Sequence, residues 1–203
     1  MLKRSYKDIR DDIQTGDIIL FSGKGIFSRL IRWFTKSKYS HVGMAVRMPE
    51  YDMVLIWEST TLSKTKDVIT GTKTKGVQVV SLSERVQGYR GKVVWRKLSG
   101  ELSKDQLYAL LELRHELRGK PYERSRLELL LAGIPNINMG NENLRSVFCS
   151  ELIAEAYQRA YLLPEHPPSN SYAPERFSQD SENSVKLTNG FALLDEVEIR
   201  RSF

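Results

Sequence analysis

The sequence predicts an α+β fold in which a mainly antiparallel sheet packs against helices. Two β-prone runs, 41–47 and 53–58, flank a turn at 48–52, a pattern typical of a hairpin. Residues 149–162 repeat apolar side chains at helical spacing, which predicts a helix with one buried face. The 203 residues are 40% hydrophobic and contain no repeats, so we expect a single domain over 1–203, with 1–13 as an N-terminal extension.

The other elements follow from composition and from turn residues. We expect strands at 17–21, 77–81, 92–97 and 191–199, and helices at 25–34, 103–118 and 124–132. Ser103 and Gly119 are suited to cap and to terminate the helix between them. Residues 60–76 are polar and lysine-rich, which indicates either a plain surface loop or a lid.

Cys149, the only cysteine, opens the run Cys149-Ser150-Glu151-Leu152-Ile153-Ala154-Glu155-Ala156-Tyr157. The helical repeat places it on the inward face with Leu152, Ile153, Ala156 and Tyr157. A helix N-terminus stabilises negative charge, so this position favours a thiolate nucleophile. The alternative is a small buried apolar residue without chemistry, the usual state of a free cysteine.

His41 opens the run Tyr39-Ser40-His41-Val42-Gly43-Met44-Ala45-Val46. Both faces of this predicted strand are apolar or small, which indicates cover on both sides and a rigidly held imidazole. Such a ring can take a proton from a nearby thiol. The alternative is a strand histidine that is satisfied by a backbone carbonyl.

Glu58 ends the second run of the hairpin, Met53-Val54-Leu55-Ile56-Trp57. A carboxylate there can accept the Nδ1–H of an imidazole on the neighbouring strand and fix its tautomer. Its role depends on a strand register that the sequence does not determine. The alternative is an exposed glutamate at a strand end.

The order His41, Glu58, Cys149 and the runs around them resemble the circularly permuted branch of the NlpC-type papain-like cysteine hydrolases, the YiiX/YebB-like proteins. Thr15-Gly16-Asp17-Ile18-Ile19-Leu20-Phe21 and Gly119-Lys120-Pro121-Tyr122 fit the same likeness, which spans about 14–178. The resemblance implies a permuted papain-like fold. It also implies Cys149 as nucleophile, His41 as base, Glu58 as the polar third member and Tyr122 near the oxyanion site.

The resemblance further implies a thiol hydrolase that cleaves amide or ester bonds through a thioester, with a peptide, another amide or a lipid acyl group as substrate. An acyltransferase belongs to the same chemistry. The alternative, from another class, is a catalytically inactive papain-like module that binds lipid or a protein partner. No cofactor is expected.

The formal net charge of +6 concentrates in 26–38, where Arg29, Arg32 and Lys36 recur at roughly helical spacing. This pattern is compatible with peripheral contact to an anionic membrane, or with a core-facing helix that has a solvated basic side. No nucleic-acid-binding motif accompanies the charge, so no nucleic acid is expected as a partner.

Metal-ligand spacings are lacking, and the three histidines are scattered, so no metal site is expected. His115 and His166 are predicted to be exposed and uninvolved. The first residues are charged where a signal peptide is apolar, and no apolar run could span a membrane. The sequence therefore predicts a cytoplasmic protein.

Overall fold

The computed structural model describes residues 1–23, 38–60, 64–121 and 149–202. Several predictions from the sequence lie outside these ranges. They are the helices at 25–34 and 124–132, the basic segment with Arg29, Arg32 and Lys36, and Tyr122.

A single sheet of seven strands organises the described residues, in the order β1-β7-β6-β2-β3-β4-β5. The strands are β1 (Leu2–Ser5), β2 (Ile18–Gly23), β3 (His41–Met48), β4 (Met53–Thr60), β5 (Gly76–Ser81), β6 (Gly91–Arg96) and β7 (Val197–Arg200). All neighbouring strands pair antiparallel except β1 and β7, which are parallel. The predicted mainly antiparallel sheet is confirmed.

The predicted hairpin is formed by β3 and β4. A short 3-10 turn, η2 (Pro49–Tyr51), joins the strands, and Asp52 closes it in the left-handed conformation, with φ of 46°. The register pairs Met48 with Met53 and Met44 with Trp57. This register fixes where Glu58 lies relative to His41.

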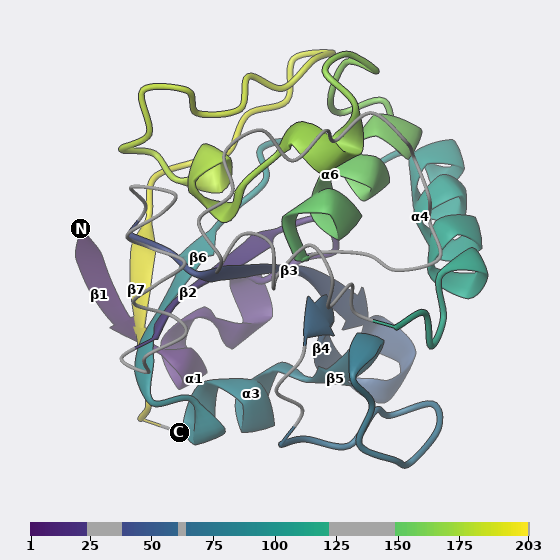
Figure 1. Ribbon diagram of the computed structural model, residues 1–203. Coiled ribbons are helices and arrows are strands. Elements are labelled where there is room, and N and C mark those ends of the chain that lie inside the picture. The colour runs from purple at the N-terminus through teal and green to yellow at the C-terminus, as the bar shows by residue number, and fades with distance from the viewer. Residues whose placement is uncertain (24–37, 61–63, 122–148, 203) are drawn as a thin grey trace, which may run out of the picture.

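Helices cover both faces of the sheet (Figure 1). On one face lie α4 (Lys104–Glu116) and α6 (Cys149–Arg159), and on the other lie α1 (Tyr6–Ile9) and α3 (Leu82–Gly88). Three further 3-10 segments are η1 (Arg10–Asp12), η3 (Ser169–Ser171) and η4 (Pro174–Phe177). Ser103 and Gln106 form a capping box at the start of α4, as the Ser103 prediction required.

The two faces of the sheet contribute to two separate hydrophobic cores because side chains alternate along each strand. Met44 and Trp57 pack in the core beneath α6, whereas Ala45 and Ile56 belong to the core beneath α1 and α3. The central strands are therefore covered on both sides, as predicted. Gly43 lets β3 and β4 approach closely, since an added Cβ would lie 2.6 Å from Ile56 Cδ1 and would displace that side chain.

The last strand is shorter than the predicted 191–199. Before β7 only Leu193 makes an isolated bridge, to Leu98. Arg96 donates its guanidinium hydrogen bonds to the carbonyls of Leu193, Leu194 and Phe177. The segment before β7 is therefore held by the Arg96 side chain together with two backbone hydrogen bonds, from Leu194 N–H to the Lys97 carbonyl and from Ser99 N–H to the Ala192 carbonyl.

Three elements at the sheet were not predicted. Residues 1–13, expected as an extension, contribute β1 and α1, and they bury Tyr6, Ile9 and Ile13. The helix α3 follows β5 directly, with Ser81 as its N-cap. Each is too short to show a clear hydrophobic period in the sequence.

Asp67 organises the described part of the lysine-rich loop, 64–75. Its buried carboxylate accepts hydrogen bonds from the backbone N–H groups of Ile69, Thr70 and Val79. Val79 belongs to β5, the strand that pairs with β4 at Glu58, so this hydrogen bond ties the loop to the sheet close to Glu58. Whether the loop acts as a lid stays a prediction.

Candidate active site

Cys149 is the first residue of α6 and is 5% exposed. The inward face predicted for this helix is confirmed, because Leu152, Ile153, Ala156 and Tyr157 are fully buried. The Tyr157 hydroxyl donates a 2.7 Å hydrogen bond to the carbonyl of Gly16, just before β2. The helix that carries the thiol is therefore fastened to the centre of the sheet.

His41 is the first residue of β3, and its side chain is 12% exposed. Phe21, its direct partner on β2, packs against the imidazole with 5.2 Å between ring centroids. The backbone N–H of Ser40 donates to the Phe21 carbonyl at 2.9 Å. The ring is thus held at the end of the strand by its neighbours on β2.

The imidazole of His41 contacts both other predicted site residues. Its Nε2 lies 2.6 Å from Glu58 Oε2, and the ring also hydrogen-bonds the Cys149 side chain. The prediction that Glu58 meets Nδ1 is wrong. Trp57 pairs with Met44 across the hairpin, and Glu58, the next residue on β4, reaches Nε2 with its carboxylate.

Glu58 is fully buried, so the alternative of an exposed strand-end glutamate is also wrong. Its Oε1 accepts one hydrogen bond from Gln78 Nε2 and one from Arg85 Nε, each at 2.8 Å. Gln78 is the direct partner of Glu58 on β5, and Arg85 comes from α3. The carboxylate therefore has partners on both oxygens.

Sequence reasoning missed Gln78 and Arg85. Gln78 is the only amide within the predicted strand 77–81, but its place opposite Glu58 follows only from the register of β4 and β5. Arg85 could not be placed without α3. A lone glutamine in an otherwise apolar strand was the one available signal.

The charges of the site determine its protonation. Burial lowers the pKa of His41, but the negative charges of Cys149 and Glu58 outweigh burial and raise that pKa to about 9. Burial raises the pKa of Glu58, but Arg85 and His41 outweigh it and lower that pKa below its usual range. The arrangement favours an imidazolium between two anions.

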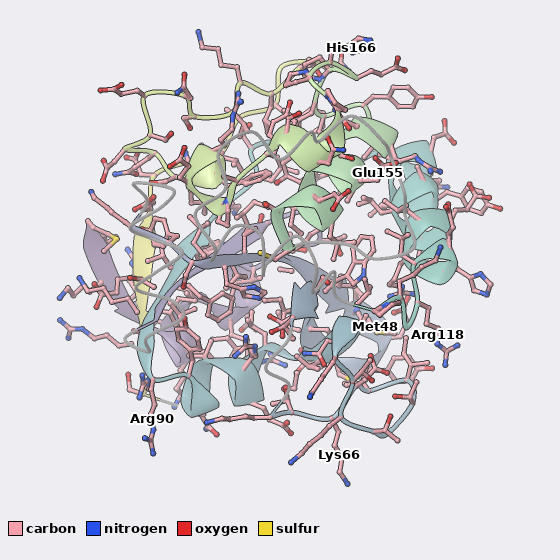
Figure 2. All side chains as sticks on the ribbon, in the orientation of Figure 1. Met48, Lys66, Arg90, Arg118, Glu155 and His166 are labelled. Atoms are coloured by element: carbon pink, nitrogen blue, oxygen red, sulfur yellow. The ribbon has the colours of Figure 1, made fainter. Side chains whose placement is uncertain are left out.

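Cys149, His41 and Glu58 are brought together by α6, β3 and β4, while the other histidines are not part of the group. His115 and His166 are exposed, and Figure 2 shows His166 among the loops beyond α6. Among the described residues, no group of three or more His, Cys, Asp or Glu side chains could hold a metal ion.

Comparison with protein families matches residues 12–190 to the permuted papain-like amidases of the YaeF/YiiX type, family C92. The chain belongs to this family. Its permuted papain-like fold is therefore established, and membership supports a cysteine hydrolase or amidase role.

Among solved structures, the chain is similar to the metalloprotein yiiX from Escherichia coli O157:H7. The identity is 26% and the TM-score 0.51, over 73% of this chain and 66% of that one, slightly less than two thirds of its length. No curated protein matches the chain. In the part of the chain that the structure describes, no helix has the length and apolar character needed to cross a membrane.

Proposed function

We propose that this member of the amidase family is a cysteine amidase that cleaves its substrate through a thioester on Cys149. The observation that carries the proposal is the imidazole of His41, which contacts Glu58 and is within hydrogen-bonding reach of the Cys149 side chain. Acyl transfer by a catalytic triad uses these three groups: a nucleophile, a base that contacts it, and a carboxylate that orients the base.

In the first half of the reaction, the thiolate of Cys149 attacks the carbonyl carbon of the amide. The tetrahedral oxyanion accepts hydrogen bonds from backbone N–H groups in the first turn of α6, which have no partner within the helix. A well-placed donor of this kind contributes about 3 kcal/mol to the transition state. His41 then gives its proton to the departing amine, and the thioester remains.

In the second half, water replaces the amine. His41, now neutral, takes a proton from the water as it attacks the thioester, and the tetrahedral intermediate collapses to release the carboxylic acid and the thiolate. Glu58 stabilises the imidazolium in both halves and keeps the ring in the orientation that faces the thiol. The cycle ends with the starting charges restored.

The substrate class proposed here is an amide, because the family to which the chain belongs is described as one of amidases. Ester or lipid acyl substrates and transfer to an acceptor other than water use the same thioester. A panel of amides, short peptides and phospholipids, with Cys149→Ala as the blank, distinguishes them. Tyr122, proposed at the oxyanion, lies outside the described residues.

The reactivity of Cys149 tests the proposal without a known substrate. We expect iodoacetamide to alkylate Cys149 faster than an ordinary cysteine at neutral pH, because a helix N-terminus and a neighbouring imidazolium favour the reactive thiolate. Alkylation should be slower in His41→Ala, because the imidazolium no longer stabilises the thiolate. His115→Ala, which removes an exposed histidine on α4, is the matched control.

A thiol that alkylates no faster than an ordinary cysteine, at a rate unaffected by His41→Ala, would contradict the proposal and favour the inactive binding module. On any substrate found in the panel, Cys149→Ala should abolish turnover, and the variant should still fold. The small apolar side chain of alanine suits the buried position of the thiol.

A further inference from the structure

Arg85 is held in a cage of described side chains next to the site. Its Nε donates to Glu58 Oε1 at 2.8 Å, and its side chain is 14% exposed. The guanidinium stacks over the ring of Phe21 at 4.9 Å and over that of Tyr89 at 5.4 Å. Phe21 and Tyr89 in turn pack edge to face, with centroids 4.9 Å apart. A planar cation between aromatic rings loses little freedom when it binds a carboxylate.

The cage connects Arg85 to His41 by two routes. One runs through Glu58, whose Oε1 accepts from Arg85 while Oε2 meets His41 Nε2. The other runs through Phe21, whose ring touches both the guanidinium and the imidazole. Since Gln78 also donates to Oε1, the carboxylate cannot rotate without breaking buried hydrogen bonds.

The charges of the group alternate along the chain of contacts. Cys149 thiolate, His41 imidazolium, Glu58 carboxylate and Arg85 guanidinium sum to zero. Without Arg85 the same buried group holds two anions and one cation. An uncompensated charge is costly in a buried site. Tyr89 is the other titratable side chain against Arg85, and Gln78 supplies an uncharged donor.

We propose that Arg85 is a positioning residue for the reaction, which holds the Glu58 carboxylate in place beside His41. This inference rests on the proposed function. Arg85 touches none of the reacting atoms: it orients Glu58 by direct contact, and its own positive charge acts on His41 across that carboxylate.

The charges that act on Glu58 and His41 agree with this role. Burial raises the pKa of Glu58, and the Arg85 cation is the largest influence that lowers it. Coulomb's law gives Arg85 an opposite influence on His41, because two cations near one carboxylate disfavour each other. Loss of the guanidinium charge should therefore raise the pH at which His41 gives up its proton.

The test compares Arg85→Met and Arg85→Lys by following the His41 ring protons by NMR against pH, with His41→Ala to assign the signals. In Arg85→Met we expect the His41 midpoint to move upward by about one pH unit. Arg85→Lys, which keeps the charge, should stay close to the unsubstituted protein. Arg90→Met is the matched control, since Arg90 is exposed just beyond α3 and projects outward in Figure 2.

The kinetic counterpart uses an amide found in the panel. Arg85→Met should lower kcat roughly 10- to 100-fold with little change in KM. This fall in kcat is smaller than the one expected for the loss of a proton-transferring group, which contributes about 10²- to 10⁴-fold. We expect Arg85→Lys, which keeps the positive charge, to restore most of the lost kcat. A purely structural arginine would lower the unfolding midpoint and leave both the His41 titration and kcat unchanged.

The outcomes separate this inference from the proposed function. An unchanged His41 midpoint in Arg85→Met, in a protein that turns over amides, overturns the role of Arg85 and leaves the amidase proposal standing. A shifted midpoint in a protein that never turns over an amide overturns the amidase proposal and leaves the coupling between Arg85 and His41. Should Arg85→Met fail to fold, Arg85→Gln removes the same charge and retains a planar donor for Glu58.

Discussion

The imidazole of His41 lies between two anions, so its protonation responds strongly to single substitutions. Cys149 acts on it from α6, and Glu58 acts on it from β4. In the proposed mechanism the protonated ring accompanies the thiolate and protonates the leaving amine. Activity should therefore decline as the pH rises through about 9, where His41 loses its proton.

Glu58→Gln should move that decline to lower pH. The amide keeps a hydrogen bond to His41 but removes one of the negative charges that raise the pKa of the ring. We expect turnover to be reduced, on the order of 10²- to 10⁴-fold, but not eliminated. The measurement is kcat/KM against pH, with Glu50→Gln, an exposed glutamate in the turn of the same hairpin, as control. A wild-type profile would remove Glu58 from the mechanism.

The sequence was sufficient to propose the three central residues and insufficient to describe their contacts. Cys149, His41 and Glu58 each stand at the start or end of a predicted element, where a side chain can leave the core. Which imidazole nitrogen faces Glu58 depends on the register of β3 and β4. The place of Gln78 depends on the register of β4 and β5. The place of Arg85 depends on α3, a helix too short to show a hydrophobic period in the sequence.

At the level of elements, the strength of the hydrophobic pattern decides what could be predicted. The helix α6 has a complete buried face, and the hairpin of β3 and β4 has a proline turn, so both were predicted with nearly their observed bounds. The segment before β7 was predicted as part of a strand over 191–199 that closes the sheet. Arg96 and the buried Glu196, which accepts a 2.6 Å hydrogen bond from Tyr39, hold it in another conformation.

The attachment of α6 to the sheet can be tested with Tyr157→Phe. The change removes the hydroxyl that satisfies the Gly16 carbonyl and leaves that buried acceptor without its partner. We expect the free energy of unfolding to fall by about 1–3 kcal/mol, measured by denaturant titration. Tyr161→Phe is the control, because that ring is 69% exposed. Equal stabilities of the two variants would show that the hydrogen bond does not anchor the helix.

For the molecule as a whole, the site makes stability depend on pH. The lowered pKa of Glu58 contributes stability above pH 4.5, its unperturbed value, and this contribution is lost as the pH falls. The raised pKa of His41 contributes stability that is complete below pH 6.5 and is lost as the pH rises through about 9. These two groups therefore stabilise the fold most between pH 4.5 and 6.5.

Thermal unfolding midpoints from pH 4 to pH 10 check this dependence. We expect the unsubstituted protein to lose stability between pH 6.5 and about 9. Cys149→Ala should show a weaker decline over the same interval, because the thiolate is the largest influence that raises the pKa of His41. Parallel curves for the two proteins would contradict the coupling of thiol and imidazole.

The proposed site is divided between the two layers that cover the sheet. The sulfur belongs to the layer of α6, whereas the carboxylate and its arginine belong to the strands and to α3. A small slide of one layer over the other would part sulfur from imidazole while every strand pair stayed intact. We therefore expect a substitution that displaces α6 without disturbing the strands to abolish turnover in a protein that circular dichroism still shows as folded.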